Sequence, residues 1–220
     1  SGENDSLTEE RDILRSSVAS LLAEGNLWII PDEELATDED PIRWLSAAVT
    51  LERAPRSSVI TLPMLHSMRH PSLLAVYGHT TSRQLVAEST AGLTSLPQLL
   101  VESKPATSQL IAVCISVTAA VAYLHSKGYA HGRLSPNSVL LIPRCSRAIV
   151  TGWWRCTTAT AAAVEQDMEG WCAVVEAVLE HISEEAVADW LLGIMQALPF
   201  QVSLSRAEYA LAALQSPPGF

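Results

Sequence analysis

The chain has 220 residues, of which 48% are hydrophobic and 17% are charged, so it can bury a sizeable core and is not a mostly disordered chain. Its formal net charge of -10 disfavours non-specific binding to nucleic acid or to an anionic membrane surface. The four cysteines form no Cys-x-x-Cys pair, which favours reduced thiols in an intracellular protein over a zinc site.

The first part of the chain is predicted to be mainly strands. Residues 7–24 are an exception, because their apolar residues recur at helical spacing and Gly25 follows as a C-terminal cap. The predicted strands share short apolar runs with polar or turn residues at their ends: 27–30, 43–52, 73–77 and 84–87. The acidic run within 32–40 is expected to be a solvated loop, and 57–68 a short helix.

The second part is predicted to be mainly helical. Residues 107–126 form a long apolar helix, whose apolar core of 15 residues, 110–124, is shorter than the roughly 20 that span a bilayer. We therefore expect a helix buried in a globular core. Short strands are predicted at 139–142 and 148–150, followed by three helices: 165–182, 184–197 and 205–214. This order indicates an α+β arrangement with a strand-rich lobe and a larger helical lobe.

One segment carries the strongest motif. Residues 120–142 read AVAYLHSKGYAHGRLSPNSVLLI. They resemble the end of a long helix, the catalytic loop and the next strand of a protein kinase, where the loop pattern is H-R-D-L-x-x-x-N. The resemblance implies that His131 and Pro136 are retained structural positions. It also implies that Arg133 replaces the catalytic Asp, Ser135 the loop Lys, and Ser138 the metal-binding Asn.

Other landmarks of the kinase family follow in the same order. Residues 65–80 resemble the end of the αC helix and the next strand, which places Thr61 about where the αC Glu would be. Residues 84–100 resemble the strand, hinge and short helix beside the nucleotide. Thr151, with Gly152-Trp153 after it, stands in place of the D-F-G motif.

The C-terminal part continues the resemblance. The run Asp167-Met168-Glu169-Gly170-Trp171 resembles the start of the central helix of the kinase C-lobe, where Asp167 would hold the catalytic-loop backbone by hydrogen bonds. Residues 183–214 resemble the last two helices of that lobe. Only 15 residues lie between Thr151 and Asp167, which implies a shortened activation segment.

The resemblance implies an α+β, bilobal protein-kinase-like fold. Its expected parts are an N-terminal helical extension at 1–25, a reduced strand-rich N-lobe at 26–88 and a mainly helical C-lobe at 89–220. Together the last two would form one pseudokinase domain.

The residues for phosphate binding are missing from the sequence. Before Gly78 the only glycines are Gly2 and Gly25, so a G-x-G-x-x-G loop cannot exist. The chain has only two lysines, both well after the strand that should carry one, and Thr50 is the candidate for the vacated position.

The residues for metal binding and proton transfer are replaced as well. Ser138 and Thr151 offer neutral hydroxyls where magnesium needs a carboxylate and an amide. Arg133 is permanently protonated and cannot act as a base. We therefore expect no catalytic residue, no metal site and no cofactor.

Two features leave alternatives open. Arg133 is expected to form an ion pair with a nearby acid, and the alternative is an anion-binding residue. Trp153 and Trp154 either pack inside the protein or form an exposed anchor that contacts a partner, since tryptophan is enriched at binding hot spots.

The leading hypothesis is a catalytically inactive pseudokinase that acts as a protein-interaction or scaffold module. The alternatives are a nucleotide-binding allosteric regulator and an active transferase with a rearranged site. Other proteins are the expected partners, and nucleic acid, membrane and small-molecule ligands are not expected. The Bub-type spindle-checkpoint pseudokinases are one candidate relative, which would place the protein inside the cell at the kinetochore or in the nucleus, and otherwise in the cytoplasm.

Overall fold

The computed structural model describes these residues: 29–38, 41–45, 47–53, 65, 68–141, 147–201 and 206–216. The predicted helix at 7–24, most of the predicted helix at 57–68, and Thr61 lie outside them. The chain divides into two compact units. The first comprises Ser1–Ala54 and Val76–Ser89, and the second comprises Pro55–Ala75 and Thr90–Phe220. We call them the strand unit and the helical unit.

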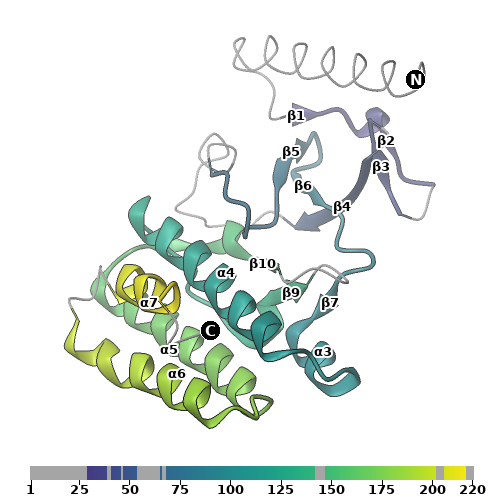
Figure 1. The fold of residues 1–220 in the computed structure, drawn as a ribbon. Coiled ribbons are helices and arrows are strands. Elements are labelled where there is room, and N and C mark those ends of the chain that lie inside the picture. Colours follow the sequence, from purple (N-terminus) through teal and green to yellow (C-terminus); the bar gives the residue numbers. More distant parts are fainter. Residues whose placement is uncertain are drawn as a thin grey trace, which may run out of the picture. The chain divides into compact units, whose positions relative to one another are not determined.

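The strand unit is built on a six-stranded sheet in the order β1-β5-β6-β4-β3-β2 (Figure 1). Its strands are β1 (Ile29–Ile30), β2 (Leu35–Ala36), β3 (Arg43–Trp44), β4 (Ala47–Arg53), β5 (Val76–Thr80) and β6 (Gln84–Glu88). The short β1 pairs with β5 in parallel, and the other neighbours are antiparallel. A small core of buried Ile30, Leu35, Val49 and Val86 packs on the sheet.

The prediction of one strand over 43–52 is wrong, because the segment is a hairpin. Leu45 has a φ of 48°, in the left-handed region, and it reverses the chain so that Trp44 of β3 pairs with Ala47 of β4. Leucine rarely adopts this conformation. Because neither Gly nor Asn marks the turn in the sequence, the apolar pattern of 43–52 predicts one uninterrupted strand.

The described acids of the acidic run are exposed, as expected of a solvated loop, and part of the run has a regular turn. Its first residues form a 3-10 turn, η1 (Asp32–Glu34). The Glu34 carboxylate accepts a hydrogen bond of 3.1 Å from Trp44 Nε1. A hydrogen bond from Thr81 holds the pKa of Asp32 below its usual value.

The helical unit contains α3 (Leu96–Glu102), α4 (Thr107–Ser126), α5 (Ala161–Leu179), α6 (Glu185–Ala197) and α7 (Arg206–Leu214) (Figure 1). Its strands are β7 (Thr94–Ser95), β8 (Tyr129–Ala130), β9 (Val139–Leu141), β10 (Ala148–Val150) and β11 (Thr157–Thr158). Its 3-10 turns are η2 (Pro136–Ser138), η3 (Trp153–Arg155) and η4 (Leu198–Phe200). These strands form the sheets β10-β9-β7 and β11-β8, and all pairs are antiparallel.

Helix α4 is the centre of this unit and packs against α5, α7 and β10. By length and composition alone it could cross a membrane, and half of that stretch is buried inside the protein. The Thr118 hydroxyl within it donates to the Cys114 carbonyl at 2.6 Å and accepts from Trp171 Nε1 at 2.7 Å. These are the contacts of a core helix.

The predicted α+β order, with strands first and helices after, is confirmed. The strand predicted to start at residue 73 starts at Val76 instead. Leu73 forms a bridge with Val150 of β10, and Leu74 donates its N–H to the Val150 carbonyl at 3.0 Å. Residues 73 and 74 therefore belong to the helical unit.

Candidate functional site

The loop 131–138 joins β8 to β9, and a buried carboxylate on α5 holds its beginning. Asp167 has no exposed surface. Its Oδ2 accepts the His131 N–H and its Oδ1 accepts the Gly132 N–H, both at 2.7 Å. A third donor, His125 Nε2, lies 2.9 Å from Oδ2. Three donors thus compensate the cost of burying this acid.

A glycine one turn further along α5 lets the same loop approach the helix. A β-carbon built on Gly170 would lie 2.3 Å from the Leu134 carbonyl oxygen and 3.0 Å from Leu134 Cβ. No side chain other than hydrogen fits there without moving the loop backbone. Asp167 and Gly170 therefore position the loop together, one by hydrogen bonds and the other by leaving room.

His131 connects the loop to the segment after β10. Its ring is buried, with Nε2 2.8 Å from the Thr151 carbonyl, and its Nδ1 accepts the Arg133 N–H at 3.3 Å. An accepting Nδ1 means that the proton is on Nε2. Burial lowers the pKa of His131, against smaller opposing effects of the Thr151 hydrogen bond and the Asp167 charge. The ring is thus a neutral structural link.

The two hydroxyls expected from the sequence at metal-binding positions form hydrogen bonds with the backbone of the loop. Ser138 Oγ donates to the Ser135 carbonyl at 2.7 Å and accepts the Ser135 N–H at 3.0 Å. Thr151 Oγ1 donates to the Ser138 carbonyl at 3.2 Å. Pro136 begins η2, where its missing N–H costs no hydrogen bond. Neither hydroxyl offers magnesium the anionic oxygen that it prefers.

Arg133 has an exposed side chain. The ion pair expected for it is not formed with any residue that the structure describes. The preceding Gly132 has a φ of 73°, a conformation that suits glycine better than the arginine of the kinase pattern. A charged guanidinium therefore lies at the surface of the loop at this position.

Trp153 and Trp154 lie inside the helical unit, so of the two alternatives the structure bears out packing inside the protein and contradicts the exposed aromatic anchor. Trp153 is 0% exposed and Trp154 is 4% exposed. Their rings meet edge to face at a centroid distance of 6.4 Å. Trp153 Nε1 donates to the Leu74 carbonyl at 2.8 Å, whereas Trp154 Nε1 has no hydrogen-bond partner among the residues that the structure describes. Their large apolar rings complete the core around η3.

This difference between the two indoles gives a prediction. Replacing Trp153 with phenylalanine should lower the free energy of unfolding by about 1–2 kcal/mol more than the same change at Trp154, because only the first leaves a buried carbonyl, that of Leu74, without its donor. Urea unfolding of both variants measures the difference, and equal losses would contradict this role of the hydrogen bond.

Of the remaining predicted site residues, Thr61 lies outside the described residues. Thr50 lies in β4 of the strand unit, opposite Ala87 of β6. The part of the chain that the structure describes contains no group of three or more His, Cys, Asp or Glu side chains arranged to hold a metal ion.

Sequence reasoning missed two residues of this site, His125 and Gly170. His125 is buried, and it supplies the third donor to Asp167. The signal that could have found it is Asp167 itself, since a buried carboxylate requires nearby donors. The close approach of Leu134 to Gly170 has no comparable signal, because a glycine in a helix is compatible with many surroundings.

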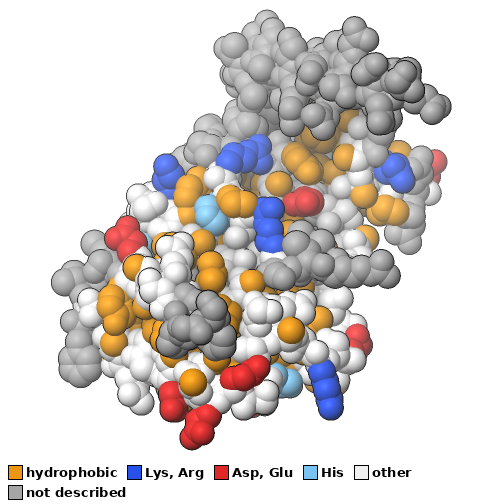
Figure 2. All heavy atoms as spheres, viewed as in Figure 1, with side chains coloured by type: hydrophobic (Ala, Val, Ile, Leu, Met, Phe, Trp, Pro, Cys, Tyr) orange, Lys and Arg blue, Asp and Glu red, His pale blue; other side chains and the backbone are white. Residues whose placement is uncertain are grey.

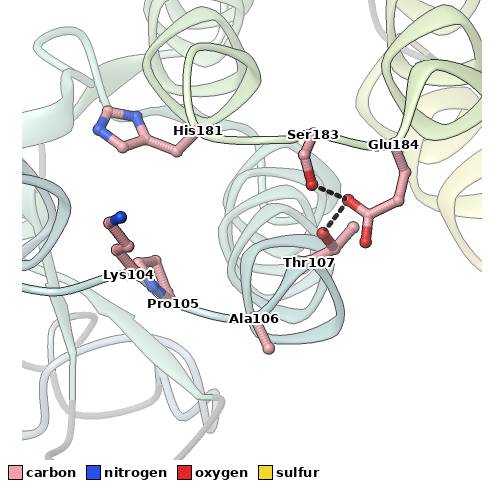
Figure 3. Close-up of a pocket in the computed structure, with 7 residues that line it drawn as sticks. All are labelled: Lys104, Pro105, Ala106, Thr107, His181, Ser183 and Glu184. Atoms are coloured by element: carbon pink, nitrogen blue, oxygen red, sulfur yellow. Dashed lines mark hydrogen bonds between the residues drawn. The ribbon is translucent and has the colours of Figure 1, made fainter.

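A surface pocket of about 460 Å³ lies elsewhere in the helical unit, between the residues that precede α4 and those that precede α6 (Figure 3). Lys104 and His181 lie on one side of it. On the other side, the hydroxyls of Thr107 and Ser183 donate to Glu184, and they hold the pKa of this acid below its usual value, Thr107 most strongly. Because its charges have both signs, the pocket does not indicate one class of ligand.

Comparison with known families agrees with the order of these elements. Residues 48–151 match the family model described as protein tyrosine and serine/threonine kinase. The match runs from β4 through the loop 131–138 to Thr151. A comparison with curated proteins finds no match.

Proposed function

We propose that this chain, which belongs to the protein-kinase-like superfamily, is a pseudokinase that binds partner proteins and does not transfer phosphate. The observation that carries the proposal is the direction of the polar groups in the loop 131–138. The hydroxyls of Ser138 and Thr151 donate to backbone carbonyls of the loop. In the resemblance to kinases, Arg133 takes the position of the catalytic base.

The chemistry of phosphoryl transfer supports this proposal. A kinase accelerates the reaction by positioning ATP and by stabilising charge with magnesium, a lysine and backbone amides. Removing a single such group commonly costs on the order of 100-fold or more in rate. This sequence lacks the glycine-rich loop, the strand lysine, the metal ligands and the base together. None of the groups on which the usual phosphoryl-transfer mechanism depends is then supplied.

The loop is nevertheless firmly held, which favours a structural role for it. Asp167, His125 and Gly170 keep its backbone in place although its reactive side chains are gone. A protein interaction needs a defined surface and no catalytic group, so the fold can serve a partner without the chemistry. An intracellular scaffold is the role that we infer, with the kinetochore or nucleus, and otherwise the cytoplasm, as its proposed location.

A nucleotide-binding regulator that works without magnesium is the second candidate. The observation that favours it is the exposed Arg133, which has no ion pair among the described residues and could face a phosphate. If the chain is such a regulator, replacing Arg133 with alanine would remove its nucleotide binding. If the chain is only a scaffold, no nucleotide binds and the substitution changes nothing in that measurement.

A phosphate-transfer assay tests the proposed function. The purified chain should transfer no label from ATP to itself or to a general protein substrate above the blank, with either magnesium or manganese. An active protein kinase at the same concentration serves as the positive control. Transfer that disappears in the Thr151→Ala or Arg133→Ala variant would overturn the proposal, because it would show activity located at this loop.

A further inference from the structure

Acidic and basic residues are unevenly distributed along the chain. Although the net charge is -10, residues 103–164 contain no Asp or Glu. The same stretch contains these six cations: Lys104, Lys127, Arg133, Arg144, Arg147 and Arg155. A segment of this composition should give part of the protein surface a positive potential.

The structure places two of these cations, Lys127 and Arg147, near the stacked rings of Tyr123 and His70, at the C-terminal end of α4. Lys127 Nζ lies 5.5 Å from the centre of the Tyr123 ring. The ring of His70 stacks on Tyr123 at a centroid distance of 5.0 Å. Tyr123 Oη accepts the backbone N–H of Arg69 at 3.1 Å, and Arg147 Nη2 donates to the Pro71 carbonyl.

We call His70, Tyr123, Lys127 and Arg147 the basic patch. Lys127 and Arg147 are exposed, and His70 and Tyr123 are partly exposed. Lys and Arg side chains, with a His among them, lie near the end of α4 on the face shown in Figure 2.

The charge of the basic patch is not neutralised by the residues that the structure describes. Neither Lys127 nor Arg147 forms an ion pair with any of them. Burial and then the positive charge of Arg147 lower the pKa of His70, and no carboxylate among the described residues opposes this. The Tyr123 ring, on which His70 stacks, gives the Lys127 ammonium an apolar base.

We propose that the basic patch is a docking surface for a segment of a partner protein that is rich in Asp and Glu. This proposal deepens the proposed function by giving the scaffold a class of partner. The protein as a whole repels polyanions, and salt screens charges beyond about 8 Å at physiological ionic strength. A short acidic segment on the basic patch is attracted by the nearby cations. A long nucleic acid would also lie close to the acidic parts of the protein surface, which repel it.

The geometry favours carboxylates over a phosphate group. One nitrogen of Arg147 already donates a hydrogen bond to the Pro71 carbonyl, and Lys127 is a single point charge over the Tyr123 ring. These cations spread over a surface and do not converge on one anion, as the bidentate recognition of phosphate requires. Several separate carboxylates along a peptide match this arrangement.

Fluorescence anisotropy with the intact protein tests the inference. The probe is a labelled peptide of alternating Glu and Ser, with a peptide of alternating Gln and Ser as the uncharged control. The Glu peptide should bind more tightly at low salt than at high salt, and the Gln peptide should not bind. Lys127→Glu should weaken binding about tenfold by replacing an attraction with a repulsion.

Lys104→Glu is the matched control, because it makes the same change of charge at the only other lysine. The two lysines flank α4, whose 20 residues span about 30 Å, so Lys104 lies far from the basic patch. This control should leave binding within about twofold of wild type, and Lys127→Arg should retain it. Arg147→Gln provides an independent loss of charge if Lys127→Glu lowers the melting temperature.

Three outcomes would overturn the proposal. They are no binding of the Glu peptide, an equal loss with Lys104→Glu, and tighter binding of a single-stranded DNA of the same charge. The titrations contain no ATP or metal, so they decide the role of the basic patch even if the transfer assay shows that the chain is an active enzyme.

Discussion

Replacing Asp167 with alanine should lower the free energy of unfolding by about 3–5 kcal/mol, because it leaves three buried donors without an acceptor. Two of them are the N–H groups of His131 and Gly132, and the third is the His125 ring. Since small domains are stable by only about 5–15 kcal/mol, this is the largest effect that we expect from a single substitution. Urea unfolding followed by circular dichroism measures it.

Glu169→Ala is the control for this experiment. It removes an acid from the same helix at an exposed position and should change stability by less than about 0.5 kcal/mol. Asp167→Asn keeps the size of the side chain and one carbonyl acceptor, so it should lose about half as much as the alanine variant. Similar stability of the Asp167 and Glu169 alanine variants would show that Asp167 does not hold the loop.

Gly170→Ala should destabilise the protein by about 2 kcal/mol, although alanine is the better helix former by about 1 kcal/mol. The reason is the Leu134 carbonyl oxygen, which lies 2.3 Å from the position of the new methyl group. Because this oxygen is a backbone atom, the clash can be relieved only by moving the loop away from α5.

Gly193→Ala in α6 makes the same substitution where, apart from the neighbouring backbone of its own helix, no atom of the described residues lies within 4 Å of the new methyl group. It should raise the free energy of unfolding by about 0.5–1 kcal/mol. The two variants are therefore expected to shift the urea midpoint in opposite directions. A stabilised Gly170→Ala variant would mean that the loop does not rest on α5 as the structure shows.

Much of the fold could be predicted because its elements have strong local signals. The apolar run of 107–126 and the glycine after it predict α4 with the bounds that the structure has. The hairpin at β3 and β4 could not be predicted, since the left-handed residue at its turn is Leu45. The start of β5 could not be predicted either, because the pairing of Leu73 with Val150 depends on a segment far along the chain.

Some features of the candidate site could likewise be predicted from the sequence, and others could not. The positions of His131, Ser138 and Asp167 follow from the order of the motifs, because the loop and α5 are each recognisable in the sequence. The burial of Trp153 and the exposure of Arg133 depend on what packs around them. Tryptophan is as common at an interface as in a core, so its type alone could not decide between the two.

The most direct test of the central claim, that the kinase-like fold no longer performs kinase chemistry, is the melting temperature of the purified chain with and without ATP and magnesium. A ligand at 100 times its dissociation constant stabilises a protein by about 2.7 kcal/mol, which shifts the melting temperature by several degrees. A scaffold without a nucleotide site predicts no shift under any condition. A rise that requires ATP and magnesium together would contradict the account, because it would show that the chain still assembles the metal–nucleotide complex of an active kinase.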